Sequence, residues 1–498
     1  MKQKVITTEE ALEADRRTRE AEGCTALDLI RKAGKALEEV FTAHFQPKPG
    51  QRIGIFSGCG HNGADALVVG QLLQRQGKDV VFVILGRPES LKPENREILS
   101  EIQAAGGKTV FFHEEKDLPE VGKIIRECSF LVDGIFGTGL NKEVSGFLRS
   151  VIELLGNAKN IFSIDIPSGL SGDNGLVQGA AVKADLTAVI EHFKAGNLLN
   201  QASDHHGVKT LVRIGLKVGD CKRSLLTKEE IAPVPRRRNF SHKYDYGNVL
   251  IVGGSPEMTG APVLSGQAAL RSGAGLVTLA LPKEARSYIK HLPPEIIARY
   301  YSDFSEFHQL LERKDAFAFG PGLGKKNSFS EAILGALLDS NLPVVVDADG
   351  IYYLKKFLKE GSRFPNVIIT PHLGELAQFV GMIPEKLTER SLEVVSELAK
   401  EHELTIVLKG PCTIIANKEE IWFQDAPNPG LATAGAGDVL TGVIASLLGQ
   451  GMPLLEAAKT GVFLHSLAGE LARAEYGEAG MIAGDVIGKL PEAIKRTS

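Results

Sequence analysis

The segment with the clearest chemical character is the glycine-rich stretch 428–438, which ends in Gly435-Ala436-Gly437-Asp438 before an apolar helical pattern. The free N–H groups of a helix N-terminus can hold a phosphoryl group and its developing charge. An aspartate in the same turn can accept the proton of a hydroxyl that attacks this phosphoryl group. The segment therefore predicts nucleotide-dependent phosphoryl transfer with Asp438 as the base. The sequence contains no G-x-x-x-x-G-K-[ST] motif, which excludes a Walker-type nucleotide site.

Other polar or glycine-rich segments of the second half follow short apolar runs. They are 320–324, 347–349, 370–375 with His372, and 409–413 beginning with Lys409. The carboxyl ends of parallel strands meet at one edge of a sheet, where ligands bind. We therefore expect these segments to contribute to one site, with His372 as a ligand-contacting residue.

The first half contains Gly58-Cys59-Gly60-His61-Asn62-Gly63, a G-x-G-x-x-G match between an apolar run and a helical pattern. This context is typical of a phosphate-binding turn. The next apolar run ends in Gly86-Arg87 and lacks the acidic residue that binds a ribose, so a standard NAD redox fold is not favoured. A tight packing turn is the alternative interpretation.

Three aspartates stand at equivalent places beside this turn. Asp65 follows it, and Asp133 and Asp165 each follow an apolar run. Grouped carboxylates repel one another, so their convergence needs a bound cation or a proton-transfer role. Lys183 and Lys194 could approach an anion here, although a solvated surface position is the alternative for each.

Apolar runs alternate with helical patterns through both halves of the chain. This order favours βαβ units and an α/β fold with a parallel sheet in each half. Segments 413–416 and 420–423 are expected to form a hairpin. The polar stretch 217–241, which contains Pro233 and Pro235, indicates the boundary between two domains. We predict domains at 1–220 and 239–498, joined by a linker at 221–238.

Composition narrows the class of protein. The 498 residues carry a net charge of -4, so the chain lacks the basic footprint of a nucleic-acid or anionic-membrane binder. No apolar run approaches the ~18 residues of a membrane span. The five cysteines are far apart and include no CxxC pair, which favours a reducing compartment. We expect a cytoplasmic enzyme with a small-molecule substrate.

These motifs together resemble known families. Residues 434–438 resemble the ribokinase-like superfamily, and with the segments of the second half they are similar to the ADP/ATP-dependent NAD(P)H-hydrate dehydratases. His242-Lys243 before Asp245-Tyr246-Gly247 also resembles that family, with Tyr244 in place of its usual glycine. Segments 58–65, 133–139 and 165–169 resemble the NAD(P)H-hydrate epimerases. The order of the halves resembles bacterial bifunctional NAD(P)H-hydrate repair enzymes.

The resemblance implies a Rossmann-like N-terminal domain, a ribokinase-like C-terminal domain and repair of hydrated NADH and NADPH. A dehydratase phosphorylates the hydroxyl of one epimer with ADP or ATP and Mg²⁺, and loss of phosphate restores the ring double bond. Asp438 is the implied base. The residues implied to contact the hydrate are Ala261, Gly322, His372 and Asp438. Those implied to bind the nucleotide are Lys409, Gly410, Pro411, Cys412, Thr413 and Gly437.

The epimerase half is implied to interconvert the two hydrate epimers, with Asp165 as the catalytic proton-transfer residue. K⁺ is implied at Asn62, Asp133 and Ser168. The residues implied to contact the hydrate are His61, Asn62, Gly63, Ala64, Asp65, Gly137, Thr138, Gly139, Leu140, Asn141, Lys142, Glu143 and Asp165. The family's loop usually has Asn-Asn-Gly-Gly-Asp-Gly, so His61 and Ala64 are departures that affect the expected epimerase rate and pH profile.

Two alternatives remain open from the sequence. The second half could be a ribokinase-like kinase of a small alcohol, which would accumulate a phosphorylated alcohol instead of releasing phosphate. The first half could be a nucleotide-binding module without turnover. The resemblance also implies a homo-oligomer and favours ADP over ATP.

Overall fold

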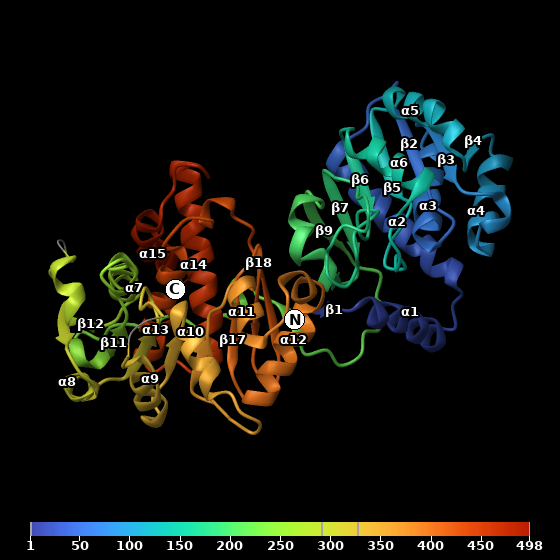
Figure 1. Ribbon diagram of the computed structural model, residues 1–498. Helices are drawn as coiled ribbons and strands as arrows, with labels where there is room; N and C mark the ends of the chain where they lie inside the picture. Colours follow the sequence, from blue (N-terminus) through green and yellow to red (C-terminus); the bar gives the residue numbers. More distant parts are fainter. Residues whose placement is uncertain (1, 290–291, 326–327, 498) are drawn as a thin grey trace. The chain divides into compact units, whose positions relative to one another are not determined.

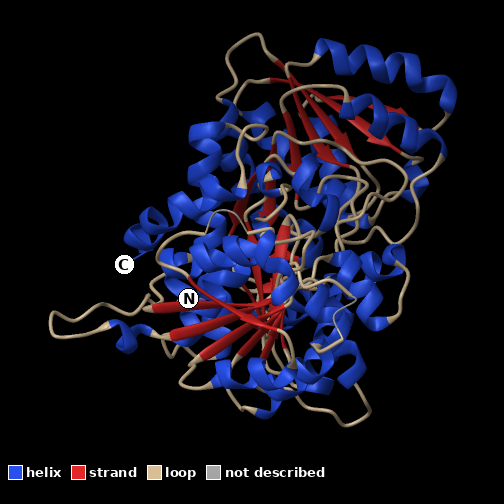
Figure 2. Cartoon of the chain, turned by 60° about the vertical axis from the view of Figure 1, so that its left-hand side comes forward, coloured by secondary structure: helices blue, strands red, loops and turns tan. Residues whose placement is uncertain are grey.

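The chain divides into two compact units in the computed structural model, which describes residues 2–289, 292–325 and 328–497. Unit 1 comprises Gln3–Cys221, and unit 2 comprises Lys2 and Lys222–Ser498. Figures 1 and 2 show that helices and strands alternate in both units. Among the described residues, no helix is both long and apolar enough to cross a bilayer.

Unit 1 is built on a seven-stranded sheet of order β4-β3-β2-β5-β6-β7-β9, in which every pair of neighbours is parallel. The strands are β2 (Arg52–Ser57), β3 (Asp79–Leu85), β4 (Lys108–Phe112), β5 (Phe130–Gly134), β6 (Ile161–Ile164), β7 (Leu186–Ile190) and β9 (Val208–Val212). A separate parallel pair joins β1 (Val5–Ile6) to β8 (Phe193–Lys194).

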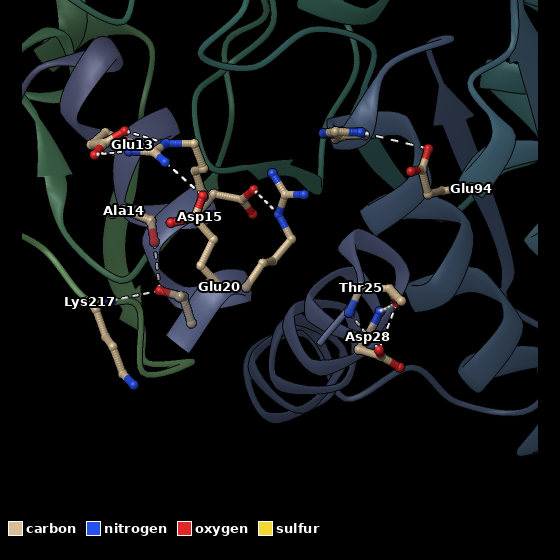
Figure 3. A network of polar contacts seen from close by, with 12 residues as sticks. Glu13, Ala14, Asp15, Glu20, Thr25, Asp28, Glu94 and Lys217 are labelled. Atoms are coloured by element: carbon tan, nitrogen blue, oxygen red, sulfur yellow. Dashed lines mark hydrogen bonds and ion pairs between the residues drawn. The ribbon is translucent and has the colours of Figure 1, made fainter. Parts of the chain in front are cut away.

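Helices cover both faces of this sheet, as expected for parallel strands that are buried on both sides. The helices are α1 (Thr8–Glu22), α2 (Ala26–Phe45), α3 (His61–Arg75), α4 (Pro93–Ala104), α5 (Leu118–Glu127) and α6 (Gly146–Gly156). Apolar side chains of α2, α3 and α4 share one core cluster with the sheet, and those of α5 and α6 share another. Capping boxes begin α1 at Thr7 and α2 at Thr25, and Figure 3 shows Thr25 beside Asp28.

Unit 2 contains a ten-stranded sheet of order β10-β19-β18-β17-β16-β15-β14-β11-β12-β13. The strands are β10 (Arg223–Leu225), β11 (Asn248–Val252), β12 (Leu276–Pro282), β13 (Ile297–Tyr301), β14 (Ala316–Phe319), β15 (Val344–Val346), β16 (Val367–Ile369), β17 (Thr405–Leu408), β18 (Cys412–Ala416) and β19 (Ile421–Asp425). The predicted hairpin is confirmed, because β18 and β19 are antiparallel neighbours. β18 also runs antiparallel to β17, and the remaining pairs are parallel.

Unit 2 also contains a set of helices, several of which pack against the sheet. They are α7 (Gly260–Arg271), α8 (Phe304–His308), α9 (Ser330–Asp339), α10 (Asp349–Leu354), α11 (Leu373–Val380), α12 (Pro384–His402), α13 (Ala436–Gly449), α14 (Leu454–Tyr476) and α15 (Ala483–Thr497). Apolar side chains of α7, α13, α14 and α15 share one core cluster with the sheet. Segment 221–238, expected as a linker, contains β10, which pairs with β19 and so extends the sheet of unit 2.

Candidate active sites

In unit 2, the N-terminus of α13 approaches the end of β17. Gly435 precedes the helix with a φ of 90°, in the left-handed region that favours glycine. A Cβ atom added at Gly437 would lie 3.2 Å from Lys409 Nζ, so the glycine allows the helix end to approach the ammonium group. Asp438 is the third residue of α13 and occupies its first turn. The structure thus brings together the predicted base, the predicted nucleotide-binding glycine and a lysine.

Lys409 and Asp347 form the centre of this site. Lys409 Nζ donates to Asp347 Oδ1 at 2.9 Å and lies 3.9 Å from Glu375 Oε2. The other carboxylate oxygen of Asp347 accepts a hydrogen bond of 2.7 Å from Thr441 Oγ1. Thr441 follows Asp438 by three positions, so both side chains lie on one face of α13. The buried Asp347 carboxylate therefore connects β17 to the helix that carries Asp438.

Asp438 is a carboxyl group whose protonation changes near neutral pH. Burial, followed by the carboxylate of Asp347, raises the pKa of Asp438 to about 7, and Lys409 acts in the opposite direction. For Lys409, burial lowers the pKa, but Asp347 and Glu375 outweigh burial and hold this pKa above its ordinary value. A carboxylate with a pKa near the working pH is suited to general base catalysis.

The residues expected to contact the hydrate lie around this helix end. Gly322 has a φ of 62°, and a Cβ atom there would lie 2.4 Å from Met258 O and 3.1 Å from Ala261 Cβ. One turn beyond Ala261 on α7, Ser265 Oγ donates to Asp438 O at 2.8 Å. Ala261 and Gly322 are therefore neighbours, and α7 ties them to the backbone of Asp438.

His372 approaches the same site from the end of β16. It is the N-cap residue of α11, where its Nδ1 accepts a hydrogen bond of 3.2 Å from Glu375 N. Lys409 N donates to Pro371 O at 2.8 Å, so His372 and Lys409 lie on adjacent strand ends. The other predicted nucleotide residues, Gly410, Pro411, Cys412 and Thr413, form the turn into β18 and its first residues.

Sequence analysis did not assign a role to Ser265, Glu375 or Thr441. Glu375 stands in a segment that was singled out only for His372, and Thr441 is marked only by its helical spacing from Asp438. Ser265 carries no sequence signal, because its contact with Asp438 O depends on the packing of α7 against α13. The site is thus completed by helix-to-helix contacts that a single sequence does not encode locally.

In unit 1, the glycine turn after β2 brings backbone segments into close contact. A Cβ atom at Gly58 would lie 2.0 Å from Ile135 O, and one at Gly63 would lie 2.1 Å from Gly58 O. Any larger side chain at either position would displace the backbone. Close backbone packing therefore requires glycine at both positions, in the turn where the sequence predicts ligand binding.

The three residues expected to bind K⁺ meet beside this turn. Asp133 is fully buried and accepts from Ser163 Oγ at 2.7 Å, Ser168 N at 2.9 Å and Ser168 Oγ at 2.5 Å. Asn62 Nδ2 donates to Phe136 O at 2.7 Å, and Phe136 N donates to Ser168 Oγ at 2.8 Å. Within the described residues, no group of three His, Cys, Asp or Glu side chains could hold a metal ion. The cluster instead offers carboxylate, amide, hydroxyl and carbonyl oxygens, the donors that hard cations take.

Asp165 is held by a buried lysine. Its φ is 65°, and its Oδ1 accepts hydrogen bonds of 2.5 Å from Lys194 Nζ and 2.9 Å from Ile190 N. Asn197 Nδ2 donates to Asp165 O at 3.1 Å. The side chain of Lys194 is only 4% exposed, so the surface interpretation of this lysine is wrong. The left-handed backbone and the ion pair with Lys194 fix the position of the Asp165 carboxylate.

Asp65 lies close enough to Asp165 for their charges to interact. Burial raises the pKa of Asp65 well above its ordinary value, and the carboxylates of Asp165 and Asp15 raise it further. Lys194 acts in the opposite direction. Asp65 therefore holds its proton to a higher pH than an ordinary aspartate, next to a carboxylate that is ion-paired.

The two departures from the epimerase pattern have separate surroundings. Ala64 is fully buried in the core cluster that α3 shares with α2, so its methyl group fills the core. His61 Nε2 lies 3.3 Å from Lys92 Nζ and 3.7 Å from Glu94, which is labelled in Figure 3. Burial, followed by Lys92, lowers the pKa of His61. His61 is thus neutral above its lowered pKa.

The remaining predicted contacts of unit 1 lie in the segment between β5 and α6. This segment contains Gly137, Thr138, Gly139, Leu140, Asn141, Lys142 and Glu143. A Cβ atom at Gly137 would lie 3.0 Å from Asn62 Oδ1, and Leu140 N donates to Gly137 O at 3.2 Å. The start of the segment therefore lies against the oxygen cluster, and its more exposed end is available to a ligand.

Comparison with known proteins gives matches along nearly the whole chain. Residues 249–492 match the family described as NAD(P)H-hydrate dehydratase, and residues 26–196 match the YjeF-related protein N-terminus. The chain is 34% identical over 512 residues to the bifunctional NAD(P)H-hydrate repair enzyme Nnr of Moorella thermoacetica, covering 99% of this chain and 96% of that one. The corresponding protein of Vibrio cholerae is 31% identical over 496 residues, covering 98% and 97%.

Solved structures resemble about half of the chain. A ribokinase-like superfamily protein from Enterococcus faecalis covers 57% of this chain and 99% of its own, with 26% identity and a TM-score of 0.50. The ADP/ATP-dependent NAD(P)H-hydrate dehydratase from Bacillus subtilis, co-crystallised with ATP/Mg²⁺, covers 55% and 98%, with 30% identity and a TM-score of 0.48. The first of these matches supports the ribokinase-like fold of unit 2.

Proposed function

The chain belongs to the bifunctional NAD(P)H-hydrate repair enzymes, and we propose which of its residues carry out each of the two reactions. It is an NAD(P)H-hydrate epimerase and an ADP/ATP-dependent NAD(P)H-hydrate dehydratase. We assign epimerisation to unit 1 and dehydration to unit 2. The assignment of dehydration is carried by one observation, the placement of Asp438 beside Lys409 at the N-terminus of α13.

In the dehydratase, Asp438 accepts the proton of the hydrate's hydroxyl as the hydroxyl oxygen attacks the terminal phosphoryl group of the nucleotide. Lys409 and the free N–H groups of α13 stabilise the charge that develops on this group. The leaving nucleotide is AMP when ADP is the donor. The phosphate then leaves the ring as a proton is lost from the neighbouring carbon, which restores the double bond.

We propose that Ala261, Gly322 and His372 position the hydrate, while residues 409–413 and Gly437 bind the nucleotide. Mg²⁺ would neutralise the charge of the nucleotide's phosphates. ADP is the proposed preferred donor, with ATP as the alternative. Asp347 orients Lys409 and is itself oriented by Thr441, since its two oxygens accept from these two residues.

In the epimerase, we propose that Asp65 acts as the acid and Asp165 as the base. Asp65 gives its proton to the departing hydroxyl, and the ring nitrogen supplies the electron pair that forms a C=N bond. Water adds to the other face of this carbon and gives a proton to Asp165. Burial of Asp65 and the ion pair of Asp165 with Lys194 give the two carboxyl groups different surroundings, which is typical of paired acid and base roles. The reverse reaction or exchange with solvent restores both groups.

The oxygen cluster of Asn62, Asp133 and Ser168 fits a monovalent hard cation such as K⁺. Its carboxylate is fully buried, and burial raises the pKa of Asp133 against its hydrogen bonds. A cation there would compensate this buried charge and anchor the glycine turn. We propose K⁺ for this place, together with a cytoplasmic location and a homo-oligomeric assembly.

The proposed function is tested by mixing the purified chain with both epimers of hydrated NADH, Mg²⁺, K⁺ and either ADP or ATP. Reduced nicotinamide is followed by its near-ultraviolet absorbance. Recovery that requires the nucleotide supports the dehydratase, and complete recovery faster than spontaneous epimer exchange supports the epimerase. A stall near half recovery would contradict turnover in unit 1. The absence of any recovery would favour an alcohol kinase.

A further inference from the structure

Unit 2 contains a cavity of about 600 Å³ whose lining includes Leu323, Gly324 and Asp349 of the predicted polar segments, but none of the residues implied to contact the hydrate or the nucleotide. It lies at the ends of β11 to β14 and is lined by Ser255, Pro256, Glu257, Met258, Pro282, Glu284, Tyr301, Ser302, Leu323, Gly324, Lys325, Ser328, Phe329 and Asp349. Its volume is in the range of about 300–1,000 Å³ that is typical of small-molecule sites.

The cavity adjoins the proposed hydrate contacts. Met258, which lines it, has its carbonyl oxygen 2.4 Å from where a Cβ atom of Gly322 would lie. Leu323 and Gly324 continue directly from Gly322 into the lining. Gly324 N donates to Asp349 Oδ2 at 2.9 Å, which fixes this wall. A ligand that contacts Gly322 therefore has the cavity next to it.

The residues proposed to bind the nucleotide donor lie on the opposite side of the central strands β15 and β16 from the cavity. The strand order places β11 to β14 on one side of β15 and β16, and β17 and β18 on the other. Residues 409–413 form the turn that follows β17 and the first two residues of β18. Because a donor and an acceptor approach a transferred phosphoryl group from opposite sides, the cavity lies on the side of the acceptor.

Two hydroxyl groups in the cavity wall lack partners. Ser255 Oγ and Ser302 Oγ are both buried and have no hydrogen-bond partner among the described residues. A buried hydroxyl without a partner is unfavourable, so a polar ligand that bonds to it gains affinity. Buried Tyr301 and the ring of Phe329 supply the apolar surface that a base would contact.

We propose that this cavity binds the adenosine half of the hydrated dinucleotide, and that its acidic rim favours the hydrate of NADH over that of NADPH. The proposal rests on the function proposed above. Glu257 and Glu284 are exposed at the rim, and among the described lining residues Lys325 is the single cation. Two carboxylates repel the 2′-phosphate that distinguishes NADPH, whereas they can accept hydrogen bonds from a free 2′-hydroxyl.

The first test compares hydrated NADH with hydrated reduced nicotinamide mononucleotide, which lacks the adenosine half. We expect kcat/KM for nucleotide-dependent dehydration to fall about 100-fold for the shorter hydrate. In the double variant Ser255→Ala with Ser302→Ala, we expect the ratio of kcat/KM for hydrated NADH to kcat/KM for the shorter hydrate to fall about tenfold. Ser396→Ala on α12 is the matched control and keeps the ratio of the unmodified chain. Equal kcat/KM values for the two hydrates in the unmodified chain would overturn the proposal.

The second test compares the hydrates of NADH and NADPH. We expect a preference for the NADH hydrate of about tenfold in kcat/KM, and Glu257→Gln with Glu284→Gln should shift it about three- to tenfold toward NADPH. Glu385→Gln on α12 is the control for a loss of exposed charge elsewhere. An unchanged preference in the double variant would contradict the role of the rim. If no hydrate is repaired with any nucleotide, the proposed function fails instead.

Discussion

Both sites pair a lysine with one carboxylate beside a second carboxyl group, but they differ in how strongly the pKa of the second carboxyl group is raised. Lys194 pairs with Asp165 in unit 1, and Lys409 pairs with Asp347 in unit 2. Burial, with the neighbouring carboxylate, raises the pKa of Asp438 to about 7 but raises that of Asp65 well above its ordinary value. We propose that this pairing accompanies a base, Asp438, in unit 2 and an acid, Asp65, in unit 1.

The largest expected effect is the loss of dehydration in Asp438→Asn. The amide cannot accept the hydroxyl proton, so we expect kcat to fall about 10³-fold. Epimer exchange in unit 1 should continue at its normal rate, which NMR of the two hydrate epimers measures. A dehydratase that retains more than a tenth of its kcat would contradict the assignment of the base.

Lys194→Met should slow epimer exchange in unit 1 and leave dehydration in unit 2 unchanged. Removing the ammonium group leaves the buried Asp165 carboxylate without its ion-pair partner, and we expect epimer exchange to slow about 10²-fold. Thermal unfolding of unit 1 should occur at a lower temperature for the same reason. Lys183→Met provides the matched control, because the structure shows Lys183 exposed. Equal epimerase rates in the two variants would refute a role for the buried pair.

Thr441→Val tests the smaller contribution of positioning. The variant removes the hydrogen bond of 2.7 Å to Asp347 without changing side-chain size much. We expect kcat for dehydration to fall about fivefold through displacement of Lys409. Thr441→Ser, which keeps the hydroxyl, should restore most of the rate. A purely structural role would lower the melting temperature but leave kcat and the KM for ADP unchanged.

The smallest expected effect concerns stability. The pKa of Asp438 is raised in the folded protein, so the folded state binds more protons than the unfolded state between the two pKa values. The contribution of Asp438 to stability therefore falls as pH rises from about 4 to about 7. Asp438→Asn should raise the melting temperature of unit 2 at pH 8 but not at pH 4, as measured by calorimetry. A stabilisation of equal size at both pH values would contradict the shifted pKa.

The sequence was sufficient to predict the α/β class, the hairpin and the strand ends that carry the polar segments. It was not sufficient for β4 and β13, because β4 has only a short, partly exposed apolar run and β13 alternates apolar with exposed residues. It also left Lys194 ambiguous, since its ion pair with Asp165 joins positions that lie 29 residues apart in the chain. Ser265 and Thr441 were missed for a related reason, as their partners are set by helix packing. Local patterns identified the chemistry, whereas tertiary contacts determined the protonation states.

The most direct test of opposite protonation states is to measure kcat/KM against pH for both activities of the same protein, with the spontaneous epimer exchange subtracted. The dehydratase should gain activity as pH rises, with a midpoint near the Asp438 pKa of about 7. The epimerase should lose activity as pH rises through the raised pKa of Asp65, where this acid gives up its proton. Two profiles that rise together through pH 7 would contradict the account.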